Sequence, residues 1–233
     1  MQFLSSSNLS SFTLRPLAWR LTAALMAAGA LLASSPASAA PGPKSTDLTQ
    51  VDENWEVQVG TPNSSLGSPQ MTFLISPTGD TNGYYAVLTV NQRDGAVGGL
   101  QLTLYNGETA ISGASQTYSD TSALATSGEK FSWTTSMSID NNGSTLTVSV
   151  SKLNSSTWGN NNQSFLTVSA PVSGLNFLNS YDLTGGLTAA NSGVDYGNQR
   201  VTKITIKSIT PYYGNHKSPG SDSLSGQTKQ VYP

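Results

Sequence analysis

Apolar residues in this chain recur at every second position, in short runs separated by Gly, Asn, Asp, Ser and Pro. This period is typical of β-strands with one buried face, whereas an amphipathic helix needs apolar residues three and four positions apart. We find no convincing amphipathic helix. The runs that predict strands are Trp55–Val59, Met71–Ile75, Tyr84–Asn91, Leu100–Tyr105, Phe131–Ile139, Thr145–Val150, Phe165–Ala170 and Val201–Ile209. This series predicts an antiparallel sandwich or barrel.

One turn between these runs is specified especially clearly. The sequence DNNGS at 140–144 joins Phe131–Ile139 to Thr145–Val150, and its Asn-Gly pair supplies the positive φ angles that a tight hairpin needs. Apolar residues alternate with Ser and Thr in both strands, so each is expected to have one solvated face. Tyr84–Asn91 is apolar in both of its rows, which predicts a central position in its sheet.

The first 39 residues have the layout of a secretory signal peptide. Arg15 and Arg20 precede the apolar run LTAALMAAGALLA at 21–33, and small residues at 37–39 provide a cleavage site. The apolar run is shorter than the roughly 20 residues that cross a bilayer. An uncleaved membrane anchor is the alternative. We expect cleavage after residue 39 or 40, a location outside the cell or at its surface, and no membrane span after cleavage.

The remaining residues are expected to form one domain with loose ends. We assign 40–52 to a flexible N-terminal segment, 53–213 to the β-sandwich and 214–233 to a flexible C-terminal tail, because both ends lack periodic apolar residues. An all-β sandwich of this length commonly forms a single domain.

The composition excludes several classes of function. Loss of Arg15 and Arg20 would change the formal net charge from −2 to −4, so we expect no nucleic-acid partner. The chain has no cysteine, and therefore no disulfide, thiolate nucleophile or thiolate ligand. Its single histidine, His216, lies in the Gly/Ser/Pro-rich tail, which disfavours a Ser-His-Asp triad or a zinc site.

The strand pattern resembles that of the concanavalin A-like lectin and glucanase superfamily. The segments YYAVLTVN at 84–91, GGLQLTLYNGE at 98–108 and RVTKITIKSI at 200–209 carry this resemblance. It implies an antiparallel jelly-roll β-sandwich of two sheets, with little or no helix and with Trp55–Val59 paired to Val201–Ile209. It also implies that a glycan would bind at a concave sheet face or at the loops along its rim.

Hydrolases of that superfamily set two or three carboxylates on alternate positions of one strand, a pattern that no strand here carries. Glu53 and Glu56 are the only close glutamates, and their spacing puts them on opposite faces of an extended chain. We interpret them as part of a solvated edge. No catalytic residue is therefore assigned, and the balance is against an enzyme.

The segment NSSTWGNNNQSF at 154–165 is one candidate ligand site. The indole of Trp158 can stack on a sugar ring while the amides of Asn160 and Asn162 bond to its hydroxyls. Alternatively, Trp158 packs onto the core and the asparagines only shape the turn.

The strand Leu100–Tyr105 offers a second candidate, because Gln101, Thr103 and Tyr105 share one face. We expect Gln101 and Tyr105 to form a polar floor beneath Trp158, unless this row simply meets water.

The turns DTNG at 80–83 and DNNG at 140–143 carry oxygen ligands of the kind that calcium prefers. Neither makes a complete site, so no cofactor or metal is expected and calcium is not favoured.

These patterns favour a secreted, non-catalytic β-sandwich whose partner is a glycan or another extracellular polymer. A structural surface or matrix protein without a small ligand is the second interpretation, and a glycan-active hydrolase or lyase is the third. A solvent-facing aromatic beside convergent polar groups would separate a binder from a matrix protein. A pair of carboxylates facing one groove would separate an enzyme from a binder.

Overall fold

The computed structural model describes residues 42–60, 71–79, 81–90, 99–118, 122–124, 126–160, 164–181, 195–196, 201–214 and 229–232. All regular structure in these ranges is β-strand, which confirms the predicted all-β class. The strands are β1 (Leu48–Val59), β2 (Met71–Ile75), β3 (Tyr84–Val90), β4 (Leu100–Asn106), β5 (Thr109–Tyr118), β6 (Lys130–Ile139), β7 (Thr145–Ser155), β8 (Gly159–Asn160), β9 (Ser164–Pro171), β10 (Asp195–Tyr196), β11 (Val201–Tyr213) and β12 (Lys229–Tyr232).

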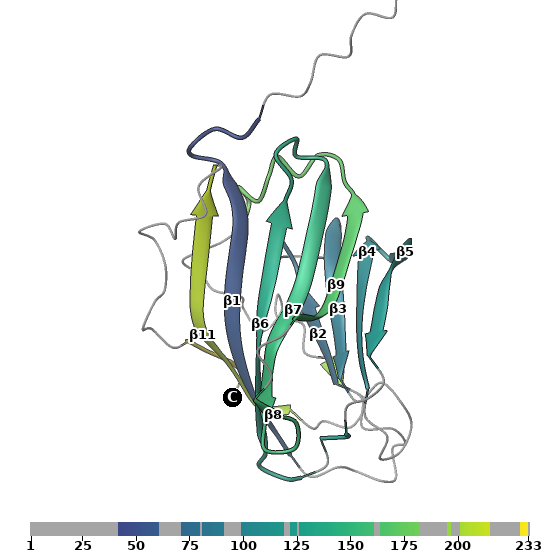
Figure 1. The fold of residues 1–233 in the computed structure, drawn as a ribbon, viewed down its shortest axis with the longest axis vertical. Coiled ribbons are helices and arrows are strands. Elements are labelled where there is room, and N and C mark those ends of the chain that lie inside the picture. Colours follow the sequence, from purple (N-terminus) through teal and green to yellow (C-terminus); the bar gives the residue numbers. More distant parts are fainter. Residues whose placement is uncertain are drawn as a thin grey trace, which may run out of the picture. The chain divides into compact units, whose positions relative to one another are not determined.

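The strands of the described ranges form two antiparallel sheets. A seven-stranded sheet has the order β12-β11-β1-β6-β7-β8, with β9 also paired to β7, and a five-stranded sheet has the order β10-β2-β3-β4-β5. Figure 1 shows β11, β1, β6 and β7 of the larger sheet side by side. The predicted central position of the third run is confirmed, since β3 pairs with β2 on one side and β4 on the other.

Two predicted pairings are present. The hairpin of β6 and β7 closes around DNNGS, with Ile139 opposite Leu146. The first and last predicted strands also pair, since β1 runs antiparallel to β11 with Trp55 opposite Ile206 and Val59 opposite Val201. Both ends of the sandwich domain therefore meet in the seven-stranded sheet.

The sheets extend beyond the predicted runs. β1 begins at Leu48, so residues 48–52, which we assigned to a flexible segment, are part of the sheet and pair with β11 and β6. β12 lies in the segment that we assigned to a flexible tail, and it pairs with β11. β5 matches no predicted run, because most of its residues are exposed and it lacks apolar alternation. It forms one border of the five-stranded sheet.

The core lies between the two sheets. Phe73 on β2 has its ring centroid 5.8 Å from that of Phe131 and 5.0 Å from that of Trp133, both on β6. Along β1, β2 and β7, buried residues alternate with more exposed ones, so one row of side chains lies inside and the other outside. Leu102 of the smaller sheet and Val148 of the larger are completely buried. In the part of the chain that the structure describes, no helix is long and apolar enough to cross a membrane.

Candidate functional site

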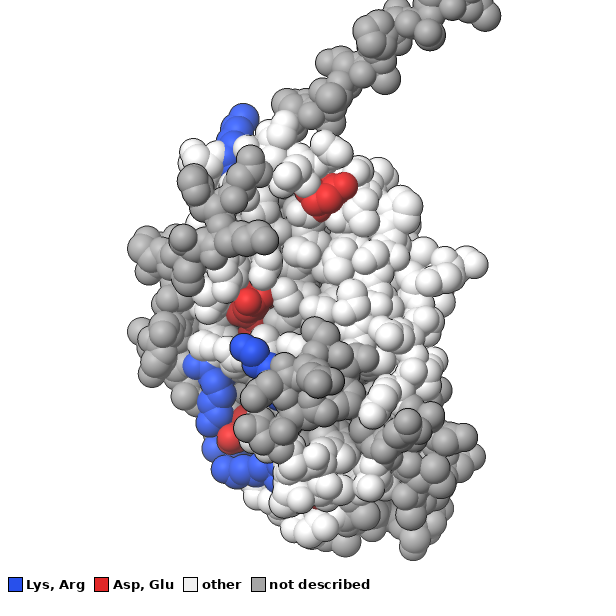
Figure 2. Space-filling view, viewed as in Figure 1, with Lys and Arg blue, Asp and Glu red and all other residues white. Residues whose placement is uncertain are grey.

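The outer face of the seven-stranded sheet is a layer of short hydroxyl and amide side chains. They alternate with core residues along four neighbouring strands, and most are half-buried. Figure 2 shows that few charged side chains interrupt this face. The outward residues are Gln50, Asp52, Asn54, Glu56 and Gln58 of β1, Ser132, Thr134, Ser136 and Ser138 of β6, Thr147, Ser149 and Ser151 of β7, and Thr167 and Ser169 of β9.

Hydrogen bonds between strands hold several of these side chains in place. Thr134 Oγ1 donates to Asn54 Oδ1 at 2.6 Å, and Asn54 Nδ2 donates to Ser208 Oγ at 2.6 Å, which links β6, β1 and β11. The hydroxyls of Thr147 and Ser169 lie 2.8 Å apart across β7 and β9. The face therefore presents donors and acceptors in fixed positions, with little side-chain entropy left to lose when a polar ligand binds.

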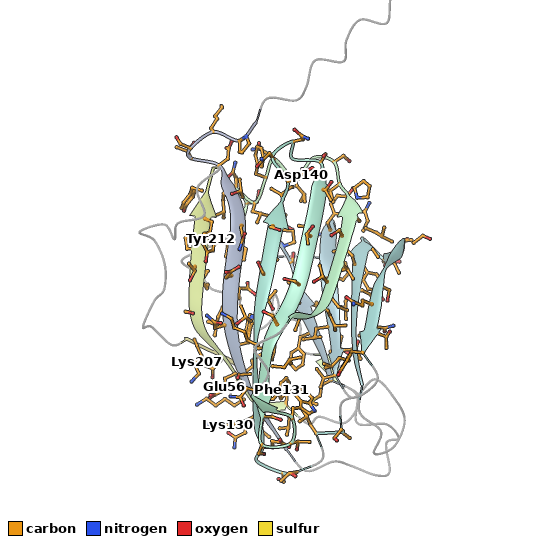
Figure 3. The ribbon with its side chains drawn as sticks, in the orientation of Figure 1. Glu56, Lys130, Phe131, Asp140, Lys207 and Tyr212 are labelled. Carbon is orange, nitrogen blue, oxygen red and sulfur yellow. The ribbon has the colours of Figure 1, made fainter. Side chains whose placement is uncertain are left out.

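A pocket of about 180 Å³ lies at one end of this face. Its lining comes from three strands and the loop after β7: Glu56, Lys130, Phe131, Ser132, Asn154, Ser155 and Ser156. Figure 3 shows Glu56, Lys130 and Lys207 close together at this end of the sheet, with Asp140 at the opposite end. The pocket combines a charged wall with hydroxyls and an amide.

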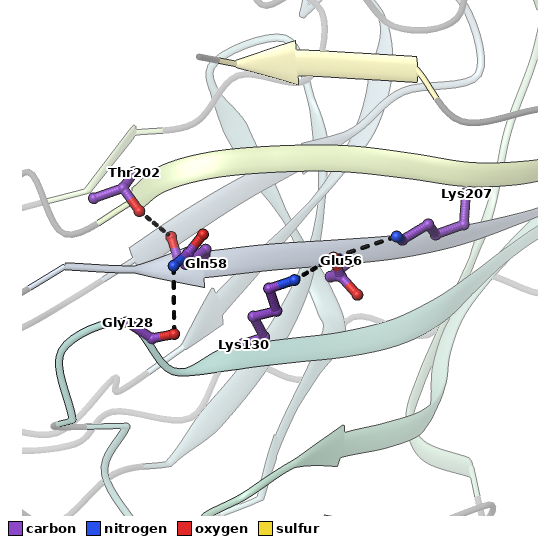
Figure 4. Close-up of polar contacts among 6 residues, drawn as sticks. All are labelled: Glu56, Gln58, Gly128, Lys130, Thr202 and Lys207. Atoms are coloured by element: carbon purple, nitrogen blue, oxygen red, sulfur yellow. Dashed lines mark hydrogen bonds and ion pairs between the residues drawn. The ribbon is translucent and has the colours of Figure 1, made fainter.

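Glu56 lies between two lysines. Its Oε1 is 3.5 Å from Nζ of Lys130 on β6 and 3.3 Å from Nζ of Lys207 on β11 (Figure 4). The side chains of these lysines are 59% and 43% exposed, so the ion pairs add little to stability. They show that both ammonium groups lie beside the Glu56 carboxylate.

Trp158 is held by the protein itself. Its Nε1 donates to the carbonyl oxygen of Ser122 at 2.8 Å, and its ring packs edge-on against Phe131 at 5.7 Å between centroids. The ring is partly buried against the core, as the alternative interpretation holds. Asn160 pairs through β8 with Asn154, and Asn162 lies outside the described residues.

Glu129 fixes the loop that carries Trp158. Its carboxylate accepts hydrogen bonds from Ser156 Oγ, from Thr157 N and from Thr157 Oγ1, at 2.8 to 2.9 Å. Burial raises the pKa of Glu129, but the hydrogen bonds from Thr157 and Ser156 outweigh it and leave the pKa below its ordinary value. An ionised Glu129 therefore stabilises this loop.

The row Gln101, Thr103 and Tyr105 faces away from the core, as alternation with the three buried leucines predicts. Tyr105 stacks on Tyr85 at 5.3 Å, and Gln101 Nε2 donates to Thr117 Oγ1 at 3.4 Å. This row belongs to the outer face of the five-stranded sheet. Trp158 instead packs against Phe131, whose side chain lies in the core. The structure therefore does not bring Gln101 and Tyr105 together with Trp158 as the floor of one groove.

The position of Glu53 shows that our interpretation of Glu53 and Glu56 as part of a solvated edge is wrong for Glu53. They do lie on opposite faces of β1, but β1 is flanked by β11 and β6, and Glu53 points into the core with 1% of its surface exposed. It accepts hydrogen bonds from Tyr181 OH at 2.6 Å and from Trp55 Nε1 at 2.9 Å. Burial raises the pKa of Glu53, and these two hydrogen bonds offset the rise only in part.

Glu53 belongs to a polar cluster inside the sandwich. Across β1 and β6 it lies opposite Thr135, and Trp55 lies opposite Trp133. Trp133 Nε1 donates to Thr135 Oγ1 at 2.9 Å, and the two indoles stack at 6.0 Å. Sequence reasoning missed this cluster, although the row of Glu53 with Trp55 and Val57 was a signal that Glu53 faces inward.

Asp140 shapes the β6–β7 turn. Its carboxylate accepts hydrogen bonds from the backbone N–H groups of Ser144 at 2.7 Å and Thr145 at 3.1 Å. Burial raises the pKa of Asp140, but the hydrogen bonds from Ser144 and Thr145 together outweigh it and leave the pKa below its ordinary value. Among the residues that the structure describes, no three or more His, Cys, Asp or Glu side chains lie together so that they could hold a metal ion. Asp80, of the other candidate calcium turn, lies outside the described ranges.

Comparison of the chain with models of known protein families and with curated proteins gives no match. Among solved structures, it is similar to a scytalido-glutamic peptidase with a transition-state analogue inhibitor, at 12% identity and a TM-score of 0.31, over 80% of this chain and 83% of that one. It is also similar to SCP-B, an eqolisin-family peptidase in complex with the tripeptide Ala-Ile-His, at 10% identity and a TM-score of 0.26, over 81% and 84%. Neither is described as a concanavalin A-like protein.

Proposed function

We propose that this chain is a secreted, non-catalytic β-sandwich that binds a glycan or another extracellular polymer on the outer face of its seven-stranded sheet. The observation that carries the proposal is the layer of hydroxyl and amide side chains on that face, several of them fixed by hydrogen bonds such as Thr134 to Asn54 and Thr147 to Ser169. Sugar hydroxyls both donate and accept, and Ser, Thr and Asn side chains match them in both roles. The signal-peptide-like N-terminus supports an extracellular partner.

The resemblance to concanavalin A-like proteins agrees with this proposal and remains itself a proposal. From the sequence we expect the ligand site at Trp158 and on the outer face of β4. The proposed site lies instead on the outer face of the larger sheet. Trp158 is hydrogen-bonded to Ser122 and packs on Phe131, while the seven-stranded sheet has the broad polar face and the pocket. A sandwich that binds a polymer needs such an extended surface more than a deep cleft.

The test is retention on a panel of soluble and insoluble polysaccharides, measured for the wild type and for Ser136→Leu/Ser149→Leu. These two residues lie opposite each other in the centre of the face. The double substitution removes two hydroxyls, each worth about 0.5–1.5 kcal/mol in a hydrogen bond, so retention should weaken about tenfold or more.

The matched control is Ser115→Leu/Thr117→Leu, which makes the same change on the exposed outer face of the five-stranded sheet. It should leave retention unchanged. Weaker retention in the control alone would move the site to the row of Gln101 and Tyr105. A wild type that no polymer retains would reject the proposal and favour a structural surface or matrix protein.

One observation favours hydrolysis as a second candidate function. Burial raises the pKa of Glu53, and a carboxylic acid that keeps its proton at higher pH can serve as a general acid. Glu53 is enclosed, however, so this function would need an opening of the sandwich near Tyr181. Release of soluble products from a polysaccharide or protein substrate by the wild type, lost in Glu53→Gln, would establish it in place of simple binding.

A further inference from the structure

Three lysines gather at the end of the larger sheet where β1 finishes. In the register of the sheet, Gln58 on β1 lies opposite Lys203 of β11 on one side and Lys130 of β6 on the other. Lys207 lies four residues along β11 and reaches Glu56. Figure 2 shows basic side chains gathered at this end of the face, where Figure 3 labels Lys207 and Lys130.

These lysines outnumber the carboxylates beside them. Glu56 Oε1 is shared by Lys130 and Lys207, at 3.5 and 3.3 Å, which leaves one of the two positive charges without a compensating negative charge in this group. Lys203 is exposed and adds another. A basic corner on a chain with a formal net charge of −2 is a local feature of this surface, and it attracts anions.

The corner borders the pocket of about 180 Å³ described above. Lys130 and Glu56 form one wall, while Ser132, Asn154 and Ser156 contribute hydroxyls and an amide. The loop before β6 is anchored to β1, since Gly128 N donates to Val59 O at 2.8 Å and Val59 N donates to Glu129 O at 2.9 Å. Gln58 Nε2 adds a longer contact of 3.5 Å with the carbonyl oxygen of Gly128 (Figure 4). An ammonium group beside neutral hydrogen-bonding groups suits a sugar that carries one negative charge among several hydroxyls.

We infer that this pocket and the basic corner beside it bind the anionic unit of an acidic polysaccharide. Lys130 in the pocket wall and Lys207 next to the pocket would face its carboxylate or sulfate, and Ser132, Asn154 and Ser156 would bond to its hydroxyls. The inference rests on the polymer binding proposed above and names its substrate class. Glu56 holds the two ammonium groups apart and competes with the ligand for them. Loss of its charge should therefore strengthen binding, which a purely structural role for Glu56 would not produce.

The experiment compares four polymers by affinity electrophoresis: a polyuronate, a sulfated dextran, neutral dextran and double-stranded DNA. The wild type should bind the polyuronate, the sulfated dextran or both more tightly than neutral dextran, and added salt should weaken this preference. Preference for one acidic polymer identifies carboxylate or sulfate as the group bound. Lys130→Gln and Lys207→Gln should each weaken acidic-polymer binding about fivefold, and Glu56→Gln should tighten it by a similar factor.

Lys44→Gln is the matched control, because it removes an exposed lysine near the start of β1, where only the backbone of Lys44 makes hydrogen bonds that the structure describes. It should leave binding unchanged. Equal binding to DNA, or equal losses in Lys44→Gln and Lys130→Gln, would overturn the inference in favour of general attraction of polyanions. Retention on neutral dextran alone, or binding to none of these four polymers while the wider polysaccharide panel retains the wild type, would overturn it while the proposed function stands. No retention on that panel either would overturn both.

Discussion

Glu53 is held in the core by two hydrogen-bond donors, one close to it in the chain and one far from it. Trp55 lies two residues away on the same strand, whereas Tyr181 follows β9 and lies 128 positions along the chain. No basic side chain is among these hydrogen-bond partners, so the ionised form would be buried without a countercharge, which is costly. The protonated acid fits the site, since it still accepts from both donors.

The buried carboxyl makes stability depend on pH. In the unfolded chain Glu53 has its ordinary pKa of 4.5, and in the folded chain the pKa is raised by burial. As pH rises above 4.5, the unfolded state loses a proton that the folded state keeps, so the free energy of unfolding falls until the folded pKa is passed. Urea denaturation at several pH values should show that Glu53→Gln removes this decline and is the more stable protein near neutral pH.

Glu56→Gln is the control for that substitution, because it makes the same change on the opposite face of β1. The Glu56→Gln variant keeps Glu53, so its free energy of unfolding should still fall as the pH rises above 4.5. Asp47, Glu129 and Asp140 have lowered pKa values and lose their contribution to stability as pH falls through those values, so the informative quantity is the difference between each variant and the wild type. Identical profiles for Glu53→Gln and the wild type would show that Glu53 is not enclosed as described.

Substitution of Trp158 tests whether the β7–β8 loop stabilises the fold or binds a ligand. Full truncation of a buried tryptophan costs about 3–5 kcal/mol, and a partly buried one that packs on Phe131 should cost about 2 kcal/mol. Trp158→Ala should therefore lower the melting temperature clearly while polysaccharide retention of the folded protein stays the same. The opposite result, unchanged stability with lost retention, would return the ligand site to the loop at 154–165.

The β6–β7 hairpin was predictable because its turn chemistry is local. Asp140 and Gly143 lie within the same five residues, and Gly143 has φ +66°, a conformation that other L-residues avoid. The Asn106-Gly107 pair at the end of β4 carries the same information, and Gly107 has φ +55°. That pair could have located β5, which apolar alternation does not reveal. Glycine and asparagine in turns thus identify strands at the border of a sheet better than hydrophobicity does.

Gly143→Ala should destabilise the protein by about 1–2 kcal/mol, the cost of a left-handed conformation for an L-residue. An added Cβ would lie 3.7 Å from the ring of Phe177, an ordinary contact, so strain in the backbone is the expected cause. Gly83→Ala is the matched control, because its Cβ would meet nothing within 4 Å and its φ is not positive. Thermal unfolding of the two variants should differ, and equal loss in both would remove turn geometry as the explanation.

The sandwich as a whole follows from strand alternation, whereas its candidate binding face does not. Period-two patterns specify which row of the predicted strands is buried, and pairing of β1 with β11 joins the two ends of the domain in the larger sheet. A patch such as Lys130, Lys203 and Lys207 depends on the register between three strands, because residues more than 70 positions apart become neighbours. Sequence spacing within one strand cannot reveal such a patch, and for this reason the candidate site predicted from the sequence lies at the loop of Trp158.

The strands at the C-terminal end provide the last prediction. Truncation after Gly214 removes β12, which pairs with β11 around Thr205, but leaves β11 paired with β1. That variant should stay folded, with a modest loss of stability, and should self-associate more in size-exclusion chromatography because the β11 border is exposed.

Truncation after Lys203 instead removes Ile204, Ile206 and Ile209, each at most 1% exposed, together with nearly all of the strand that pairs with β1. Burial of one such side chain is worth about 1.5–3 kcal/mol, and the free energy of unfolding of a domain is about 5–15 kcal/mol in total. This variant should therefore be unfolded by circular dichroism and limited proteolysis. Cooperative unfolding of both variants at similar temperatures would mean that β11 does not complete the sheet, and it would also remove the basis for placing Lys203 and Lys207 beside Glu56.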